Sequence, residues 1–394
     1  MKHIVCVAVV LLLFVGYTQS AEIPAIVTIT EHNGGFCSAA FSPDGTKIVT
    51  GAKNKTACVW DATTGQKLLT LQHADWVRTA TFSPDGKKIA TSGDDKISRI
   101  WDADSGKELC KLVGGRPGFS PDGKKIVTVN HDTDARMWKP ILIWDAETGK
   151  ELHKLEGHTN SVWITVFAPD GKKIATTGYD GTVRIWDVES GKELHQWAGN
   201  KVAFSPDGKK VVTNVFRDSL VKIWDVESGN ELKTLEGHEG WVRSAAFSPD
   251  GKKVVTTNED ETARIWDVES GMELQRLQGD PNDRHDWRNG LWDGKMWGGE
   301  LIWSVGEQMR EGSPAKVQFG DAVFSPDGKV ILTTGESNLF RDRTARIWDT
   351  ETGKQVQVLD GHADELILEA SFSPDGKKVV TEAGGRTVRI WTLE

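Results

Sequence analysis

The sequence predicts an all-β fold, an eight-bladed β-propeller of four-stranded antiparallel blades. The first observation behind this prediction is a pentapeptide, Phe-Ser-Pro-Asp-Gly or once Phe-Ala-Pro-Asp-Gly, that occurs eight times. The copies lie at residues 41–45, 82–86, 119–123, 167–171, 204–208, 247–251, 324–328 and 372–376. The second observation is a tryptophan that follows each copy about twenty residues later: Trp60, Trp101, Trp144, Trp186, Trp224, Trp266, Trp348 and Trp391. Self-similarity at such a period is typical of a repeat architecture.

One unit, residues 158–199, shows why each repeat should be a small sheet. Residues 161–167 are mostly β-branched or aromatic, which predicts a strand. The Ala-Pro-Asp-Gly sequence that follows predicts a tight turn, because proline presets φ and glycine tolerates the left-handed conformation. Three more strands are predicted at 173–177, 182–186 and 193–197. Four short strands cannot bury both faces of their sheet alone, but eight sheets stacked radially can.

With this pattern the chain resembles the WD-repeat β-propeller family over residues 22–394. The resemblance implies that a histidine, a threonine or serine, an aspartate and the tryptophan form one hydrogen-bonded set within a blade. Three sets match: His73, Thr91, Asp95 and Trp101; His158, Thr176, Asp180 and Trp186; and His238, Thr256, Asp260 and Trp266. Buried polar groups need partners, so we expect these histidines to be structural and predict no metal site.

Other units depart from the family pattern. Asn54 replaces the aspartate in the first unit and Gly385 replaces it in the last, while the third and fifth units lack the Gly-His pair. In the third unit, Trp138 stands ten residues after Thr128, so Trp138 is an alternative to Trp144 as the tryptophan of that blade.

The two ends of the chain are expected to meet. A spare strand at residues 26–31 precedes the first unit, and the last unit stops after its third strand. We expect the N-terminal strand to complete the last blade and close the ring, which leaves no unpaired edge there. The strand order also places Cys37 and Cys58 too far apart for a disulfide. We expect these cysteines and Cys110 to be buried free thiols.

The first twenty residues predict a secretory signal rather than part of the fold. Lys2 precedes an apolar run from Ile4 to Val15, and small residues stand before Ala21. This layout is typical of a cleaved signal peptide, and an uncleaved anchor is the alternative. We therefore expect an exported, bacterial family member that is secreted or periplasmic, with the propeller at 21–394 and no membrane span after cleavage. Its charges, −9 net, are interspersed, which argues against a nucleic-acid partner.

The candidate binding residues lie on one face of the predicted disc. Turns between the first and second and between the third and fourth strands of each unit repeat closely. The turns between second and third strands and the crossovers between units differ, and they form what we call the variable face. The candidates there are Trp76, Arg78, Asp94, Trp163, Tyr179, Trp241, Arg243 and Glu259. Exposed Trp, Tyr and Arg often anchor partners, although individual Trp rings could instead pack under neighbouring loops.

A tryptophan-rich insertion at about 279–318 interrupts one crossover on this face. Trp287, Trp292 and Trp297 lie within it, and Gly298-Gly299 predicts a hairpin turn. Two interpretations stay open: a hairpin that forms one wall of a binding site, or the remnant of a ninth blade with its own small core.

The function predicted from these features is that of a non-catalytic, exported interaction scaffold. We expect a monomer that binds a protein or peptide on the variable face, without a cofactor. One alternative is an exported enzyme, because the turn-and-tryptophan sequence weakly resembles quinoprotein dehydrogenases, whose vicinal cysteine pair is absent here. A hydrolase or a glycan-binding propeller are further alternatives.

Overall fold

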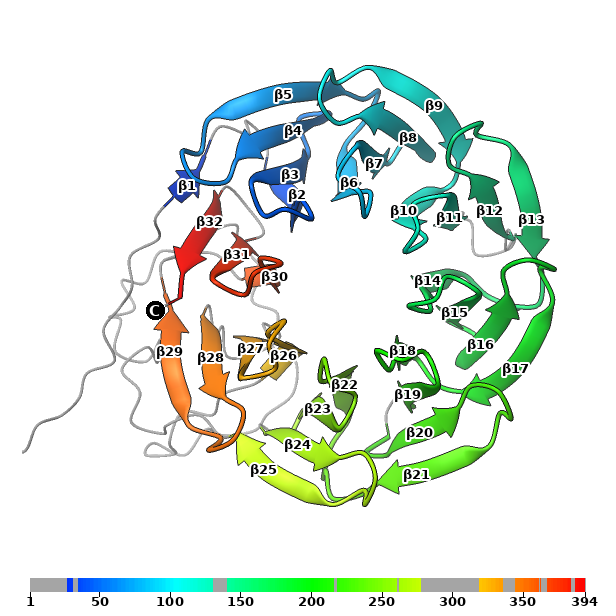
Figure 1. Cartoon of the computed structure of the whole chain (residues 1–394), viewed down its shortest axis with the longest axis vertical. Helices are drawn as coiled ribbons and strands as arrows, with labels where there is room; N and C mark the ends of the chain where they lie inside the picture. The colour runs from blue at the N-terminus through cyan, green and yellow to red at the C-terminus, as the bar shows by residue number, and fades with distance from the viewer. Residues whose placement is uncertain are drawn as a thin grey trace, which may run out of the picture.

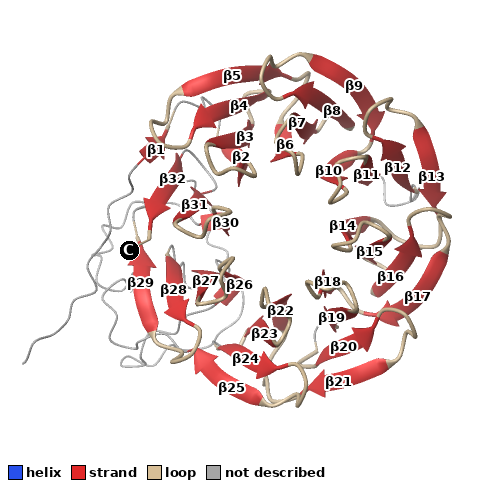
Figure 2. Ribbon diagram, in the orientation of Figure 1, coloured by secondary structure: helices blue, strands red, loops and turns tan. Residues whose placement is uncertain are grey.

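The computed structural model describes residues 27–30, 35–129, 140–215, 218–260, 262–277, 319–335, 344–360, 362, 367–383 and 387–393. Within these residues, eight four-stranded antiparallel sheets are arranged radially in a closed ring (Figures 1 and 2). The prediction of an eight-bladed propeller is therefore confirmed. The predicted signal at 1–20 lies outside the described residues.

The blades follow one another along the chain, each running from its innermost to its outermost strand. Blades 1 to 4 consist of β2 (Phe36–Phe41), β3 (Lys47–Ala52), β4 (Thr56–Asp61) and β5 (Lys67–Gln72); β6 (Val77–Phe82), β7 (Lys88–Gly93), β8 (Ile97–Asp102) and β9 (Glu108–Val113); β10 (Gly115–Phe119), β11 (Lys125–Val129), β12 (Ile141–Asp145) and β13 (Glu151–Leu155); β14 (Val162–Phe167), β15 (Lys173–Gly178), β16 (Thr182–Asp187) and β17 (Glu193–Ala198). Blades 5 to 8 consist of β18 (Lys201–Phe204), β19 (Lys210–Asn214), β20 (Val221–Asp225) and β21 (Glu231–Leu235); β22 (Val242–Phe247), β23 (Lys253–Asn258), β24 (Ala263–Asp267) and β25 (Glu273–Leu277); β26 (Phe319–Phe324), β27 (Val330–Gly335), β28 (Ala345–Asp349) and β29 (Gln355–Leu359); β30 (Ile367–Phe372), β31 (Lys378–Ala383), β32 (Thr387–Thr392) and β1 (Val27–Ile29).

The ring is closed by β1, as the sequence predicts. This strand pairs antiparallel with β32 and so supplies the outermost strand of blade 8. Its inward side chains Val27 and Ile29 are 8% and 2% exposed, and they share a buried cluster with Trp60 of blade 1. The N-terminal strand therefore joins the two ends of the chain through both backbone pairing and apolar packing.

The repeated Pro-Asp-Gly turn has a defined geometry that also links neighbouring blades. In blade 1 the Ser42 hydroxyl donates to the Asp44 carboxylate at 2.6 Å, and this hydrogen bond lowers the pKa of Asp44. Gly45 adopts a φ of 69°, a conformation that costs other residues free energy. A Cβ atom on Gly45 would stand only 3.6 Å from Pro374 of blade 8. The same Gly-to-Pro approach recurs from blade to blade around the ring.

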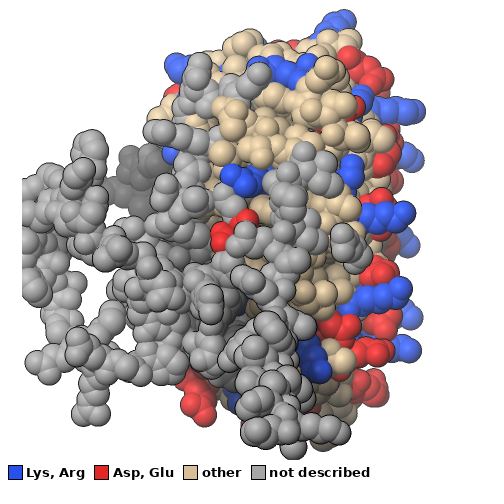
Figure 3. Space-filling view, turned by 90° about the vertical axis from the view of Figure 1, so that its left-hand side faces the viewer, with Lys and Arg blue, Asp and Glu red and all other residues tan. Residues whose placement is uncertain are grey.

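The face that carries these turns, which we call the repeat face, also carries ion pairs between successive blades. In blades 1 to 4 a lysine at the start of the second strand reaches an acid in the third-to-fourth-strand turn of the next blade. The pairs are Lys47–Asp104, Lys88–Glu147, Lys125–Glu189 and Lys173–Glu227, at 3.1, 2.8, 3.9 and 3.6 Å. Seen edge-on, Lys/Arg and Asp/Glu side chains alternate along the right-hand face of the disc (Figure 3). Each exposed pair contributes little to stability.

The apolar core consists of layers between adjacent sheets. Trp186 of blade 4, for example, packs with Val127 and Ile143 of blade 3. Each sheet thus buries its faces against its two neighbours, and the ring as a whole replaces a single central core.

The cysteines only partly match the prediction of buried free thiols. Cys58 is free and buried, whereas Cys110 is free but partly exposed. Cys110 lies on β9, the outermost strand of blade 2, on the same side as the buried Leu112, and it is only partly covered by the apolar cluster between blades 2 and 3. The prediction was therefore wrong for the burial of Cys110. The side chain of Cys37 lies outside the described residues.

Replacing Ile29 with Ala should lower the free energy of unfolding by about 2–4 kcal/mol, because it leaves a cavity against Trp60. Urea unfolding followed by tryptophan fluorescence measures this change. Thr28→Ala removes the exposed side chain of the next residue on β1 and is the control, with an expected change under about 0.5 kcal/mol. Equal losses in the two variants would contradict closure of the ring through Ile29.

Candidate functional site

Every blade contains the same hydrogen bond between a tryptophan on its third strand and a threonine on its second. In each case the indole N–H donates to the threonine hydroxyl at 2.7–2.8 Å. The pairs are Trp60–Thr50, Trp101–Thr91, Trp144–Thr128, Trp186–Thr176, Trp224–Thr213, Trp266–Thr256, Trp348–Thr333 and Trp391–Thr381. This bond holds together the second and third strands, which are joined by a turn on the variable face.

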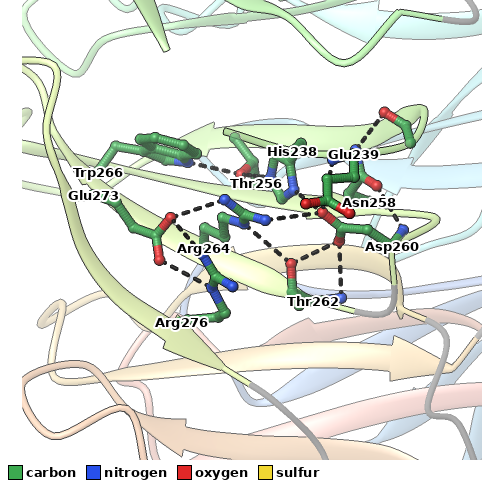
Figure 4. A network of polar contacts seen from close by, with 11 residues as sticks. His238, Glu239, Thr256, Asn258, Asp260, Thr262, Arg264, Trp266, Glu273 and Arg276 are labelled. Atoms are coloured by element: carbon green, nitrogen blue, oxygen red, sulfur yellow. Dashed lines mark hydrogen bonds and ion pairs between the residues drawn. The ribbon is translucent and has the colours of Figure 1, made fainter. Parts of the chain in front are cut away.

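In blades 4 and 6 a histidine and an aspartate extend this hydrogen bond to the variable face. His238 Nε2 contacts the Thr256 hydroxyl at 2.7 Å, and its Nδ1 contacts the Asp260 carboxylate at 2.9 Å (Figure 4). A carboxylate can only accept, so Nδ1 carries the proton and Nε2 accepts from Thr256. Burial lowers the pKa of His238 and keeps this tautomer neutral. His158, Thr176 and Asp180 repeat the arrangement in blade 4.

Blade 2 differs, because Arg99 lies between the histidine and the aspartate. Arg99 Nη1 contacts His73 Nδ1 at 2.9 Å and Asp95 at 2.7 Å. A guanidinium only donates, so Nδ1 of His73 is the acceptor and Nε2 donates to Thr91 at 2.7 Å. Burial, and next the charge of Arg99, lower the pKa of His73 to about 4. The expected direct histidine–aspartate contact is thus replaced by an arginine bridge.

A fourth histidine set, in blade 8, was not predicted. His362 contacts Thr381 through Nε2 and Thr387 through Nδ1, each at 2.8 Å. Burial lowers the pKa of His362 to about 4. The sequence does contain Gly361-His362, and Thr381 stands ten residues before Trp391. The set was not predicted because the family's aspartate is missing from this blade. Here a hydroxyl takes the place of the carboxylate.

In blade 3 the structure decides between the two candidate tryptophans. Trp144 donates to Thr128 although sixteen residues separate them. The interpretation that Trp138 takes this role was therefore wrong, and Trp138 itself lies outside the described residues. β11 ends at Val129 and β12 begins at Ile141, so the added residues connect these two strands.

The predicted binding residues on the variable face are brought together in pairs. Each pair joins the start of an innermost strand to the turn between second and third strands of the same blade. Arg78 pairs with Asp94 at 2.8 Å and Arg243 pairs with Glu259. At the equivalent place in blade 4, Trp163 stacks on Tyr179 with ring centroids 6.0 Å apart. The residues of each pair are separated by sixteen positions in the sequence.

Several aromatic rings on this face remain accessible. Tyr179, Trp76 and Trp241 are 68%, 39% and 38% exposed, whereas Trp163 is half-buried. Arg78 and Lys53 lie over the Trp76 ring at 5.0 and 5.7 Å from its centroid. These tryptophans are therefore partly packed by their own neighbours and partly available to a partner.

The insertion that carries Trp287, Trp292 and Trp297 lies outside the described residues. It lies between β25, which ends at Leu277, and β26, which begins at Phe319. Neither interpretation of its structure is tested.

Among the described residues, no group of three or more His, Cys, Asp and Glu side chains is placed to hold a metal ion. The same part of the chain contains no helix with the length and apolar character needed to cross a bilayer.

Comparisons with known proteins match the repeats. The family model described as "WD domain, G-beta repeat" matches residues 24–61, 65–102, 149–187, 195–225, 229–267, 316–349 and 353–392, more than half of the chain. The stretch that it leaves unmatched after residue 102 contains the first three strands of blade 3.

Individual relatives share only short segments. WD repeat and SOCS box-containing protein 1 of Danio rerio is 35% identical over 75 residues, 19% of this chain and 16% of the relative. An uncharacterized WD repeat-containing protein of Synechocystis sp. is 36% identical over 74 residues, 18% of this chain and 19% of the relative. Each match thus spans less than a fifth of the relative. The crystal structure of the computationally designed Ika8 protein is similar overall, with a TM-score of 0.70, 25% identity and coverage of 94% of this chain and 99% of that one.

The buried histidines should make the protein less stable as the pH falls from about 6.5 to 4. Over this range the unfolded chain takes up protons on histidine that His73 and His362 cannot accept in the folded state. The free energy of unfolding should therefore fall by up to about 3 kcal/mol for each of the two. Urea unfolding at a series of pH values measures it. A variant with His73→Gln and His362→Gln should show a shallower fall, and an unchanged slope would contradict the assignment.

Proposed function

Because the chain belongs to the WD40-repeat family, we propose that it is an interaction scaffold that binds a protein or peptide on its variable face. The observation that carries this proposal is the contrast between the two faces of the disc. The repeat face presents the same turns in successive blades, and four of its lysines pair with acids of the next blade. The variable face presents aromatic and charged side chains that differ between blades, including Trp76, Tyr179 and Trp241.

The exposed side chains are of the kinds that anchor protein partners. Trp, Tyr and Arg are enriched among residues that dominate binding energy, since they combine a large apolar area with a polar group. The described residues of the variable face contain all three within blades 2, 4 and 6. The frame beneath them is rigid, because buried hydrogen bonds hold their turns, and a rigid frame reduces the entropy lost on binding.

The relatives support the scaffold role and nothing narrower. Their names describe them as repeat proteins, and the shared segments are the repeats. Any activity of the remaining parts of those proteins is not carried over to this chain. The proposal is thus a non-catalytic, monomeric scaffold whose specificity depends on its own variable face.

Export is a further part of the proposal and is supported by residues 1–20, with Lys2 before an apolar run. Expression in a bacterial host with a periplasm tests it. The mature protein should be recovered from the periplasm or medium and should begin at Ala21 by mass spectrometry. A chain that retains residues 1–20 in the cell pellet would contradict export.

Replacing both Trp241 and Arg243 with Ala should weaken partner binding by about tenfold or more while the melting temperature stays nearly the same. Partners are captured from the extracellular or periplasmic fraction and identified by mass spectrometry, and their affinity for each variant is then measured by titration. Met272→Ala with Arg276→Ala is the matched control, because Met272 is exposed and both residues lie beyond β24, on the outer edge of the same blade. Equal binding by the two double variants would remove this part of the variable face from the proposal.

A further inference from the structure

On the innermost strand of each blade, one residue lies opposite the threonine that accepts the tryptophan hydrogen bond. The residue just before it on that strand differs in charge from blade to blade. In blade 2, for example, Ala80 lies opposite Thr91, so the position is Thr79. Four blades carry a charged residue there: Arg116 in blade 3, Lys201 in blade 5, Asp321 in blade 7 and Glu369 in blade 8. The positive charges thus lie on one side of the ring and the negative charges on the other (Figure 1).

The two positive residues converge on blade 4, which lies between them. Arg116 Nη1 donates a hydrogen bond to the Trp163 carbonyl oxygen. The Lys201 ammonium group lies 5.1 Å from the centroid of the Trp163 ring. Trp163 in turn stacks on the exposed Tyr179. We call these four residues the cationic aromatic site.

This site lacks the acid that neutralises its equivalents. In blades 2 and 6 the cation at the start of the innermost strand is paired with a carboxylate from the adjacent turn. Blade 4 has Trp163 and Tyr179 at those two places, and the cations come instead from the neighbouring blades. Among the described residues, neither Arg116 nor Lys201 forms an ion pair. The charges of Arg116 and Lys201 are therefore not neutralised by a carboxylate among the described residues.

Arg116 is held in this place by an unusual backbone conformation. Its φ is 48°, in the left-handed region that residues other than glycine rarely adopt. Its N–H donates to the Ser92 hydroxyl of blade 2 at 3.0 Å, and β10 is bulged at this point. Strained residues of this kind cluster at functional sites, where the surrounding structure maintains them. Here the strain presents an exposed guanidinium beside Trp163.

The acidic side of the ring limits what kind of anion can bind. Asp321 and Glu369 line a cavity of about 400 Å³, which Lys201 also lines. Burial, together with the nearby charge of Asp321, raises the pKa of Glu369. A long polyanion lying across the ring would bring its charges close to these two carboxylates. An anionic group confined to blades 3 to 5 would avoid them. The charge pattern thus favours a short, locally acidic ligand over a nucleic acid.

We propose that the cationic aromatic site binds a short acidic segment of a protein partner. Its Asp or Glu carboxylates would lie between the Arg116 guanidinium and the Lys201 ammonium group, and an adjoining apolar side chain would contact the exposed Tyr179 ring. A carboxylate and a guanidinium form strong, directional hydrogen bonds. A sugar needs an open ring face, whereas the faces of Trp163 are approached by Tyr179 and Lys201. This inference rests on the proposed function, and it identifies the chemistry of the partner at blades 3 to 5.

An array of synthetic dodecapeptides tests the proposal with the full-length mature protein. The peptides combine acidic, neutral or basic compositions with and without one aromatic residue, and the affinities of the best binders are measured by fluorescence anisotropy. Acidic peptides should bind best. A variant with Arg116→Ala and Lys201→Ala should weaken their binding at least about tenfold, which corresponds to about 1.4 kcal/mol, and added salt should also weaken it.

The matched control is Lys124→Ala with Lys172→Ala, which removes two exposed lysines from the repeat face of blades 3 and 4. It changes the net charge equally and should leave peptide binding unchanged. A lack of preference for acidic peptides, or equal losses in both double variants, would overturn the proposal. Stronger binding of a heparin oligosaccharide, lost in the Arg116/Lys201 variant, would assign the site to acidic glycans and also overturn it. If Trp241 and Arg243 still prove necessary for partner capture, the scaffold function stands even when this inference fails.

Discussion

The hydrogen bond between the tryptophan indole and the threonine hydroxyl is the interaction on which the rest of the structure depends. A four-stranded sheet buries too little apolar area to be stable alone, so each blade needs its neighbours. The tryptophan meets this need from the third strand, because its ring packs between sheets, as Trp186 does against blade 3. Its N–H would then be buried without a partner, at a cost of about 1–3 kcal/mol. The threonine on the second strand removes that cost and fixes the register of the two strands.

The histidine sets add a second level to this frame, and they alternate around the ring. They occur in blades 2, 4, 6 and 8, where His73, His158, His238 and His362 each contact the threonine of the tryptophan bond. The chemistry at the far end of each histidine varies: an arginine, an aspartate or a hydroxyl. In all three arrangements the histidine is buried, and burial lowers its pKa and so favours the neutral form. The alternation also matches the variable face, because the side-chain pairs Arg78–Asp94, Trp163–Tyr179 and Arg243–Glu259 stand on three of these four blades.

Much of the fold followed from the repeats, because each unit carries its own turn residues and its own tryptophan. Closure by β1 was predictable for the same reason: one strand was missing at the end and one was spare at the start. Features that join residues across long separations were harder to predict. Trp144 lies sixteen residues from Thr128, and the arginine bridge between His73 and Asp95 requires knowledge of the side-chain geometry. Cys110 is on the side of β9 that faces blade 3, and its partial exposure depends on how far the neighbouring blade covers it.

The binding chemistry of such a ring can change without loss of stability, because frame and recognition use different residues. Charge varies at one position of the innermost strand, which holds Arg116, Lys201, Asp321 and Glu369 in four blades. This position lies one residue before the partner of the tryptophan-bonded threonine, so its side chain adds little to the core. Hydroxyl and aliphatic residues occupy the same position in the remaining blades, and those blades keep the same sheet. Arg116 and Asp321 are exposed there, Lys201 is half-buried, and burial raises the pKa of Glu369, so the cost of a charge differs between blades. Eight equivalent positions on one rigid frame therefore allow an asymmetric pattern of charge to form on a nearly symmetric fold, and that asymmetry is what a partner can recognise.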